Sequence, residues 1–170
     1  VSDLDGTLLR GDAKLSDYSR GTLTELLDAG LHFTVASARA WGEIRLVLGD
    51  LPLTLPVIAI NGAFITEYAT GKHLVINNIE NDFAQTIYQH ILGHSLMPFI
   101  VTFNGTEDCL YWEKLINAEM QWYHDILHVE KIKRLRQTDD LQKSLKEKVI
   151  AFAVLGPKEN IQSLWRQLAD

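Results

Sequence analysis

The chain has little cysteine and no long apolar run, and each shortage excludes a class of protein. Cys109 is the only cysteine among the 170 residues, which excludes an intrachain disulfide and a thiolate metal cluster. The most apolar stretch, residues 51–60, is interrupted by two prolines and a threonine and falls short of the ~20 apolar residues that span a bilayer. We therefore expect a cytoplasmic protein that makes no contact with a membrane.

Basic residues are in the minority. There are 16 lysines and arginines against 22 acidic residues, so the formal net charge is −6. Nonspecific nucleic-acid binding requires a basic surface that neutralises phosphates, so we expect no nucleic-acid partner. A small phosphorylated metabolite is not excluded, because one local cation reverses the field within a site. The basic stretch at residues 131–136 is interpreted as a solvated face.

Targeting signals are also scarce. No signal peptide is visible, and because the chain begins at Val1 rather than at Met, we expect an N-terminal piece to precede it. Asn104-Gly105-Thr106 matches the glycosylation pattern. Asn-Gly is equally a strong signal for a hairpin turn, and nothing else in the sequence indicates secretion. We interpret this segment as a turn.

The first third of the chain alternates short apolar segments with amphipathic ones. Ser16 is placed to cap a helix over residues 17–29, and Gly30 is placed to end it. The other elements expected here are a helix at 41–48 and strands at 1–4, 31–36 and 57–60. Short apolar strands separated by helices are typical of a parallel sheet covered on both faces, which is an α/β fold.

The pattern changes after the Asn61-Gly62 pair. Hairpins are expected around Gly71 and around Asn104-Gly105. The expected elements are strands at 64–66, 73–76, 97–103, 109–113 and 149–155, and helices at 82–92, at 115–124 and from Pro157 onward. This change of pattern predicts two domains: a core over residues 1–78 and an α+β module over residues 79–170.

The segment Asp3-Leu4-Asp5-Gly6-Thr7-Leu8-Leu9 carries the most specific chemistry in the sequence. Its two carboxylates lie at the carboxyl end of the first expected strand, where open α/β sheets place their ligands. Residues i and i+2 of a strand point to the same side, although the turn at Gly6 offers Asp5 another route toward a ligand.

Two like charges this close together require a compensating cation, and Mg²⁺ prefers such oxygen ligands. A bound cation would keep Asp3 ionised. We expect crowding to raise the pKa of the carboxyl that faces away from the metal, and we expect that carboxyl to be Asp5. A raised pKa would prepare Asp5 to donate a proton.

Two further strand ends bring polar groups to the same edge. Ser37 ends the second expected strand, and its hydroxyl and the next backbone N–H are placed to reach an anion near Asp3. Asn61 ends the third expected strand. Because neighbouring parallel strands end at one edge of a sheet, we expect the acid pair, the hydroxyl and the amide to converge there.

Taken together, these motifs resemble the haloacid dehalogenase superfamily. The segment from Asp3 to Leu9 is followed by Ala36-Ser37-Ala38-Arg39 and by Asn61-Gly62-Ala63, in an order and spacing similar to the Cof-type phosphatases of subfamily IIB. The resemblance implies a Rossmann-like core with a parallel sheet, incomplete in this chain, and an α+β cap domain inserted after the third strand.

The resemblance also implies roles for single residues. By position, Asp3 resembles the family's nucleophile, which forms an aspartyl-phosphate, and Asp5 resembles its general acid and base. The Asp3 carboxylate and the Asp5 backbone carbonyl resemble two Mg²⁺ ligands. Ser37 resembles the hydroxyl that holds the transferring phosphoryl group, assisted by the backbone N–H groups of Leu4 and Ala38.

Four further residues are candidates for support or substrate contact. Thr7 is expected to fix the turn by hydrogen bonding. Arg39 either pairs with an acidic side chain or reaches the substrate, and Asn61-Gly62 forms either a plain turn or a ligand contact. The family has Thr-Gly-Arg where this chain has Ser37-Ala38-Arg39, and the substitution retains both the hydroxyl and the N–H.

The chain departs from the family pattern beyond the expected cap. The family requires a lysine and a second acidic pair on later core elements. Asp139-Asp140 comes after a basic stretch rather than an apolar strand, so it is a poor stand-in for that pair. We therefore expect the 170 residues to be part of a longer protein, and to be weakly active or inactive alone.

The function that the resemblance implies is a Mg²⁺-dependent phosphatase. Its substrate would be a small phosphomonoester: a sugar phosphate, a nucleotide or a phosphorylated cofactor. Three alternatives stay open, namely a phosphotransferase or mutase with the same intermediate, a receiver-like regulatory protein, and a substrate-binding pseudoenzyme. Receiver-like proteins separate the phosphorylated aspartate from the acidic pair by a βαβ unit, whereas here both carboxylates share one turn. The sequence leaves the oligomeric state open.

Overall fold

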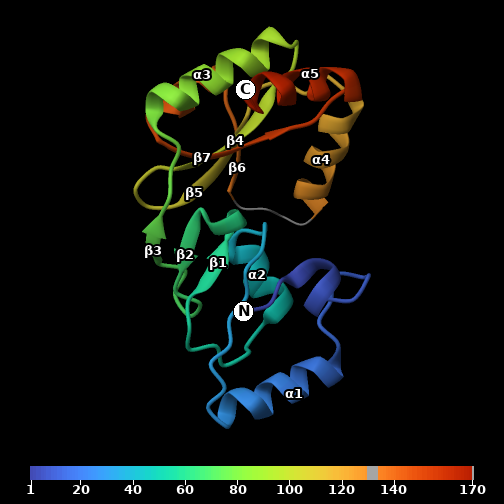
Figure 1. The fold of residues 1–170 in the computed structure, drawn as a ribbon, viewed down its shortest axis with the longest axis vertical. Coiled ribbons are helices and arrows are strands. Elements are labelled where there is room, and N and C mark those ends of the chain that lie inside the picture. Colours follow the sequence, from blue (N-terminus) through green and yellow to red (C-terminus); the bar gives the residue numbers. More distant parts are fainter. Residues whose placement is uncertain (130–133, 170) are drawn as a thin grey trace. The chain divides into compact units, whose positions relative to one another are not determined.

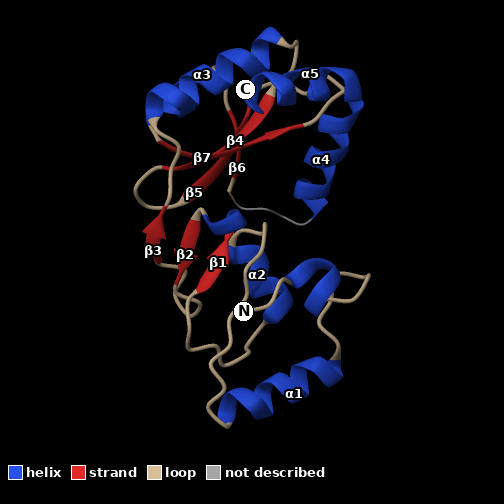
Figure 2. Ribbon diagram, in the orientation of Figure 1, coloured by secondary structure: helices blue, strands red, loops and turns tan. Residues whose placement is uncertain are grey.

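The computed structural model describes residues 1–129 and 134–169. The chain divides into two compact units, Val1–Asn77 and Asn78–Asp170, each with its own sheet and helices (Figures 1 and 2). This mixed composition confirms the α/β fold class. None of the described helices combines the length and the apolar composition that a bilayer crossing requires.

The first unit aligns three chain segments in parallel, as predicted. Single parallel bridges join Ser2 to Val35 and Ala36 to Ile58. Backbone N–H groups of Ala36 and Ile58 donate to Ser2 O and Val35 O, each at 2.9 Å. The first two segments are therefore bridges rather than the full strands expected at 1–4 and 31–36.

The third segment, β1 (Val57–Ala59), turns back on itself. It pairs antiparallel with β2 (Phe64–Thr66), and β2 pairs antiparallel with β3 (His73–Ile76). The β2–β3 hairpin was predicted, but the β1–β2 pairing was not. Its cause is local, because Ile60 and Asn61 adopt left-handed φ angles of 47° and 53°. The expected strand over 57–60 consequently ends one residue early, and the sheet is mixed.

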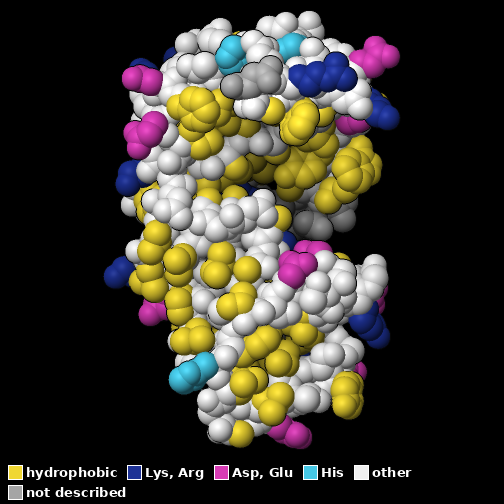
Figure 3. All heavy atoms as spheres, in the orientation of Figure 1, with side chains coloured by type: hydrophobic (Ala, Val, Ile, Leu, Met, Phe, Trp, Pro, Cys, Tyr) yellow, Lys and Arg dark blue, Asp and Glu magenta, His cyan; other side chains and the backbone are white. Residues whose placement is uncertain are grey.

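The helices of the first unit lie close to their predicted bounds. Helix α1 (Asp17–Asp28) is capped by Ser16, whose Oγ accepts the Ser19 N–H at 3.0 Å. Helix α2 (Trp41–Leu48) has the expected bounds, and only its cap residue, Ala40, separates it from the Ser37-Ala38-Arg39 segment. Apolar side chains remain on the surface of this unit (Figure 3), among them Leu26 of α1, which is 45% exposed.

Helix α2 is tied to the loop between β2 and β3 through three contacts. Trp41 Nε1 donates to Tyr68 O at 3.1 Å, and Tyr68 Oη donates to Gly49 O at 2.6 Å. The Arg45 guanidinium carbon lies 4.6 Å from the centre of the Tyr68 ring. These contacts hold α2 in place, and α2 is the helix that follows the Ser37-Ala38-Arg39 segment.

Gly71 lies in the same loop and admits no side chain. Its φ is +79°, and a Cβ built there would lie 2.9 Å from the Trp41 ring. Replacing Gly71 with alanine is therefore expected to lower the free energy of unfolding of the first unit by about 2–4 kcal/mol, through left-handed strain and overpacking together. Urea unfolding monitored by tryptophan fluorescence measures this loss.

Two alanine substitutions separate the causes of that loss. Gly30 has a φ of +92° but nothing within 4 Å of its Cβ position, so Gly30→Ala carries the backbone strain alone. Gly42 lies within α2 and has the same open space, so Gly42→Ala is expected to be neutral or stabilising. An effect of Gly71→Ala no larger than that of Gly30→Ala would contradict a steric role for Trp41.

The second unit is a four-stranded sheet in the order β6-β5-β4-β7. Its strands are β4 (Pro98–Phe103), β5 (Asp108–Trp112), β6 (Leu135–Gln137) and β7 (Lys148–Val154). Strand β4 pairs antiparallel with β5 and β7, whereas β5 pairs parallel with β6. Figure 1 shows α3 (Asn81–Gly93) and α5 (Lys158–Ala169) together over the sheet, and α4 (Ala118–Val129) along the right-hand side of this unit.

The core of the second unit forms between these helices and the sheet. One buried cluster joins α3 to β4, β7 and the short 3₁₀ helix Leu141–Lys146, and consists of Ala84, Tyr88, Ile100, Leu141, Leu145 and Val149. A second cluster joins α3 to α5 through Ile91, Leu96 and Leu164. This unit therefore buries its own apolar core.

Most elements of the second unit agree with the predictions. The β4–β5 hairpin, β7 and the last helix are confirmed, and α4 begins at Ala118 rather than at residue 115. Strand β6 was not predicted, because its three residues fall in and beside the stretch interpreted as a solvated face. Of that stretch, residues 131–133 lie outside the described residues, and Arg136 lies in β6 with its side chain 42% exposed. The interpretation was wrong for Arg134, whose side chain is only 14% exposed and pairs with Asp108 at 3.5 Å.

Candidate active site

Asp3 directly precedes a single π turn, Leu4–Leu8, and Asp5 lies within it. The turn is closed by the Leu9 N–H, which donates to Leu4 O at 2.8 Å, and it contains Gly6 at a φ of 75°. Leu4 is fully buried and anchors the turn, whereas Asp3 and Asp5 are exposed. The turn is a loop rather than a helix, because Asp5 (φ −75°, ψ 121°) and Gly6 (φ 75°, ψ 2°) have non-helical backbone angles.

Asp3 precedes this turn in extended conformation, with φ −73° and ψ 161°. Thr7 Oγ1 donates to Asp3 Oδ2 at 3.3 Å, so the threonine both belongs to the turn and orients the carboxylate. The N–H of Leu4 makes no backbone hydrogen bond to the described residues. Asp3 thus presents an exposed anionic oxygen beside an N–H donor.

Asp5 is held by a two-pronged contact with Arg39. Arg39 Nε donates to Asp5 Oδ2 at 2.8 Å, and Arg39 Nη2 donates to Asp5 Oδ1 at 2.7 Å. The side chains are 22% exposed for Arg39 and 51% exposed for Asp5, so water reaches the pair and limits its contribution to stability. Of the two roles open to Arg39, the structure therefore has the pairing with an acidic side chain.

This contact overturns one prediction. The hydrogen bonds from Arg39, and to a lesser degree its charge, hold the pKa of Asp5 below its ordinary value of 3.8. The expected rise was wrong because the group nearest to the Asp5 carboxylate is a guanidinium rather than the second carboxylate. In this arrangement Asp5 is an anion.

Ser37 lies at the end of the second aligned segment and is buried. Its Oγ accepts the Arg39 N–H at 3.2 Å, which folds the Ser37-Ala38-Arg39 segment into a tight turn. Ala38 is exposed, and its N–H donates to no group in residues 1–129 or 134–169. That N–H and the Ser37 hydroxyl are therefore two donor groups available to an anion.

Backbone hydrogen bonds bring the three segment ends to one edge. The Ser37 N–H donates to Ile58 O, and the Asn61 N–H donates to Ser37 O, each at 3.0 Å. The Ala36 N–H bonded to Ser2 O fixes Asp3 beside the same segment. The convergence expected from the sequence is thus present in the backbone.

Asn61 and Gly62 make the turn that ends this edge. Asn61 is exposed, and Gly62 has a φ of 91° and accepts Asn77 Nδ2 on its carbonyl at 2.9 Å. Within the described part of the chain, the Asn61 side chain makes no hydrogen bond. The observed contacts of this pair are those of a turn.

Sequence reasoning missed one residue that shapes the site. Glu43 Oε2 accepts the Ala40 N–H at 2.9 Å and so fixes the first turn of α2, which begins two residues after Arg39. A glutamate three residues after a helix cap is the relevant signal. It was overlooked because the residue at the cap position is alanine rather than serine or threonine.

The donor atoms at the Asp3–Asp5 turn fit a hard divalent cation. The exposed Asp3 carboxylate and the Asp5 carbonyl are oxygen donors of the kind that Mg²⁺ prefers. Across residues 1–129 and 134–169, no three or more His, Cys, Asp or Glu side chains gather into a cluster suited to a metal. The described residues therefore offer part of a Mg²⁺ shell, in which water and phosphate oxygens ordinarily complete the rest.

Comparison with known proteins places the whole chain in one family. A family model for haloacid dehalogenase-like hydrolases matches residues 1–170. A 5-amino-6-(5-phospho-D-ribitylamino)uracil phosphatase of Bacillus subtilis is 27% identical over 164 residues, which are 96% of this chain and 54% of that protein. An HMP-PP phosphatase of an Enterobacter species is 35% identical over 85 residues, 50% of this chain and 31% of that protein.

Solved structures show the same fold. A protein of Thermotoga maritima superimposes with a TM-score of 0.75 at 23% identity, covering 99% of this chain and 60% of that one. A phosphatase of the same superfamily from Bacteroides thetaiotaomicron gives a TM-score of 0.73 at 18% identity, covering 98% of this chain and 59% of that one. The chain thus spans about half of the Bacillus relative, 54% of its length, and about three fifths of these structures.

Proposed function

This chain belongs to the haloacid dehalogenase-like hydrolases, and from that premise we propose that it carries the nucleophile and the phosphate-holding groups of a Mg²⁺-dependent phosphatase. The observation that carries the proposal is the meeting of three segment ends at one edge. That edge holds an exposed carboxylate at Asp3, a hydroxyl at Ser37 and exposed backbone at Ala38. An anionic nucleophile beside N–H and O–H donors is suited to phosphoryl transfer.

In the first step, an Asp3 carboxylate oxygen attacks the substrate phosphorus. A phosphorus–oxygen bond forms to Asp3 as the bond to the ester oxygen breaks, and Asp5 gives that leaving oxygen a proton. The Ser37 hydroxyl and the N–H groups of Leu4 and Ala38 donate to the non-bridging oxygens, where negative charge accumulates. The products are an alcohol and an aspartyl-phosphate.

In the second step, water displaces the phosphoryl group from Asp3. The Asp5 carboxylate takes a proton from the water as its oxygen bonds to phosphorus, and the Asp3 carboxylate leaves with its electron pair. The Arg39 contact keeps Asp5 anionic, which suits this base step. For the acid step, Asp5 must first loosen from Arg39 and take up a proton.

Mg²⁺, when bound by the Asp3 carboxylate and the Asp5 backbone carbonyl, would offset the repulsion between the nucleophile and the phosphate. Thr7 donates to Asp3 Oδ2 and so holds the carboxylate in one orientation for attack.

The second unit is proposed as a cap, over residues 79–170, that closes on the site, excludes water and selects the substrate. A small phosphomonoester, such as a sugar phosphate, a nucleotide or a phosphorylated cofactor, is the substrate class we propose. The names of the Bacillus and Enterobacter relatives support this class, since each denotes a phosphatase of a small phosphorylated compound.

Water is proposed as the phosphoryl acceptor rather than an alcohol. The hydrolase family and the phosphatase relatives support this choice over a phosphotransferase or mutase. A transferase would yield a second phosphorylated product in place of inorganic phosphate, and a signalling protein would retain a long-lived phosphorylated form. These three outcomes separate the alternatives.

The test is release of inorganic phosphate by the full-length protein. An aryl phosphate is expected to be hydrolysed in the presence of Mg²⁺, with one phosphate released for each phenol. Adding EDTA is expected to reduce turnover to background, and excess Mg²⁺ to restore it, since metal-assisted charge neutralisation is worth several kcal/mol in such transition states. Hydrolysis that persists in EDTA would refute the metal-dependent mechanism.

A further inference from the structure

We infer that Asn104 is a site of spontaneous deamidation, at which the turn between β4 and β5 assembles the reaction centre from its own backbone. Asn104 comes directly after the last residue of β4 and precedes Gly105, and both are exposed. The reaction requires water as its only other reactant. It is independent of the proposed phosphatase function and concerns the second unit alone.

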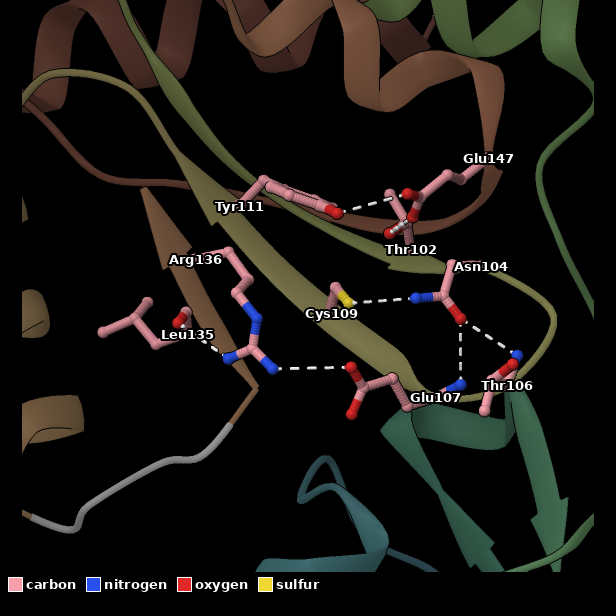
Figure 4. A network of polar contacts seen from close by, with 9 residues as sticks. All are labelled: Thr102, Asn104, Thr106, Glu107, Cys109, Tyr111, Leu135, Arg136 and Glu147. Carbon is pink, nitrogen blue, oxygen red and sulfur yellow. Dashed lines mark hydrogen bonds and ion pairs between the residues drawn. The ribbon is translucent and has the colours of Figure 1, made fainter. Parts of the chain in front are cut away.

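The side-chain carbonyl of Asn104 is held by two backbone donors (Figure 4). Asn104 Oδ1 accepts the N–H of Thr106 at 2.9 Å and the N–H of Glu107 at 3.0 Å. These bonds hold the side-chain carbonyl against the backbone of the two residues that follow Gly105. Two N–H groups on one carbonyl oxygen also polarise the amide carbon and stabilise the oxyanion formed when a nucleophile adds to it.

The other end of the amide is fixed as well. Asn104 Nδ2 donates to Cys109 Sγ at 3.7 Å, a length suited to a sulfur acceptor (Figure 4). Burial raises the pKa of the Cys109 thiol, so the sulfur stays protonated and uncharged near neutral pH. The amide thus keeps one orientation, with its oxygen on the two N–H donors and its nitrogen directed away from them.

Gly105 leaves the attack unobstructed. Its φ is +101°, and nothing lies within 4 Å of the position that a Cβ would take. Its N–H makes no hydrogen bond to the described residues, so it is not committed to the hairpin ladder. The nucleophile and the electrophile therefore belong to adjacent residues that are already held in a compact turn, which favours an intramolecular reaction.

The reaction balances with water alone. The Gly105 nitrogen loses its proton to water or hydroxide and bonds to Asn104 Cγ, and the charge that develops on Oδ1 rests on the Thr106 and Glu107 N–H groups. The bond from Cγ to Nδ2 then breaks, and the nitrogen takes a proton and leaves as ammonia. Water opens the resulting succinimide ring at either carbonyl, which yields aspartate or isoaspartate.

The product changes the hairpin. Aspartate adds a negative charge beside Glu107, whose Oε1 already pairs with Arg136 at 3.4 Å, and it removes the amide donor to Cys109. Isoaspartate lengthens the backbone by one carbon and so disturbs the register that pairs Phe103 with Asp108. We expect the modified second unit to unfold at a lower urea concentration.

The chain contains its own control, because Asn61-Gly62 is the same dipeptide. Asn61 has left-handed backbone angles, φ 53° and ψ 32°, and its side-chain oxygen receives no hydrogen bond from the described residues. In a folded chain, Asn104 should therefore react faster than Asn61. In an unfolded chain, the two sites should react alike.

The experiment compares the two sites in one sample. Full-length protein is held at mildly alkaline pH, either folded or in urea, and peptide mass spectrometry tracks deamidation at each site, with isoaspartate-specific methylation as a second readout. We expect Asn104 to react about 10²-fold faster than Asn61 in the folded protein, since one oxyanion donor is worth about 10²–10³-fold in rate. We expect the ratio to approach one in urea. The inference would be overturned if the ratio of the Asn104 rate to the Asn61 rate were the same in the folded protein and in urea. Faster reaction at Asn61 in the folded protein would also overturn it.

A matched pair of variants isolates the donor effect. Thr106→Pro removes one N–H from Asn104 Oδ1 and is expected to slow deamidation in the folded protein, whereas Thr106→Ala keeps the N–H and is expected to leave the rate unchanged. If Thr106→Pro does not fold, the comparison of Asn104 with Asn61 in the native chain still decides the question.

Discussion

Replacing Asp3 with asparagine in the full-length protein is expected to lower kcat by on the order of 10⁴-fold or more, for aryl and alkyl phosphates alike. The amide oxygen carries no charge to attack phosphorus. The fold should persist, because asparagine keeps the shape of aspartate and its Oδ1 still accepts the Thr7 hydroxyl. The measurements are phenol release and circular dichroism on the same preparation.

A matched control removes a carboxylate that has no proposed role. Asp50 is fully exposed and pairs only loosely with Arg45, at 3.7 Å, so Asp50→Asn is expected to retain full activity. Labelled phosphate from the substrate should attach to the native protein and not to Asp3→Asn. Turnover that survives in Asp3→Asn, or label that attaches to it elsewhere, would show that the nucleophile is another residue.

The second large effect is expected at Asp5, and it should depend on the leaving group. Asp5→Asn cannot transfer a proton, so hydrolysis of alkyl phosphates, which need a proton on the leaving oxygen, is expected to fall by about 10²–10⁴-fold. Aryl phosphates release a stable phenolate, so their first step should fall much less. The water step still lacks its base, and the aspartyl-phosphate is therefore expected to accumulate with aryl substrates. Rapid-quench detection of that intermediate measures this outcome.

Arg39→Lys serves as the comparison for Asp5→Asn. Lysine keeps the positive charge near Asp5 but loses the fork that bonds both carboxylate oxygens, so a smaller loss without accumulation of the intermediate is expected. If Asp5→Asn slows aryl and alkyl substrates equally and no intermediate accumulates, then Asp5 positions other groups rather than transferring protons.

Much of the fold could be predicted because its signals are local. Ser16 caps α1 by bonding the Ser19 N–H, and the Asn104-Gly105 pair marks the β4–β5 hairpin, each within a few residues. The return of β1 onto β2 could not be predicted, because it depends on a left-handed φ at Ile60, and isoleucine gives no sign of such a conformation. Strand β6 was missed because its partner, β5, is distant in sequence.

The candidate site likewise has features that could be predicted from the sequence and features that could not. The Asp3 and Ser37 positions could be predicted from short motifs at strand ends, which are readable in the sequence. The pairing of Asp5 with Arg39 spans 34 residues, and the direction of the Asp5 pKa shift depends on which charge lies nearest. A sequence gives the types of the groups but not their distances, so the shift was assigned the wrong sign.

The π turn at Leu4–Leu8 constrains how this region can change during evolution. Its closure from Leu9 to Leu4 spans five residues rather than four. Asp5 and Gly6 inside it have non-helical backbone angles, φ −75° with ψ 121° and φ 75° with ψ 2°, so the turn is a loop of fixed length rather than a helix. Deleting one residue would break its closing hydrogen bond and move Asp5 away from Arg39. Insertions and deletions should therefore be purged here as strictly as exchanges of the two carboxylates, so the length of the loop is inherited together with Asp3 and Asp5.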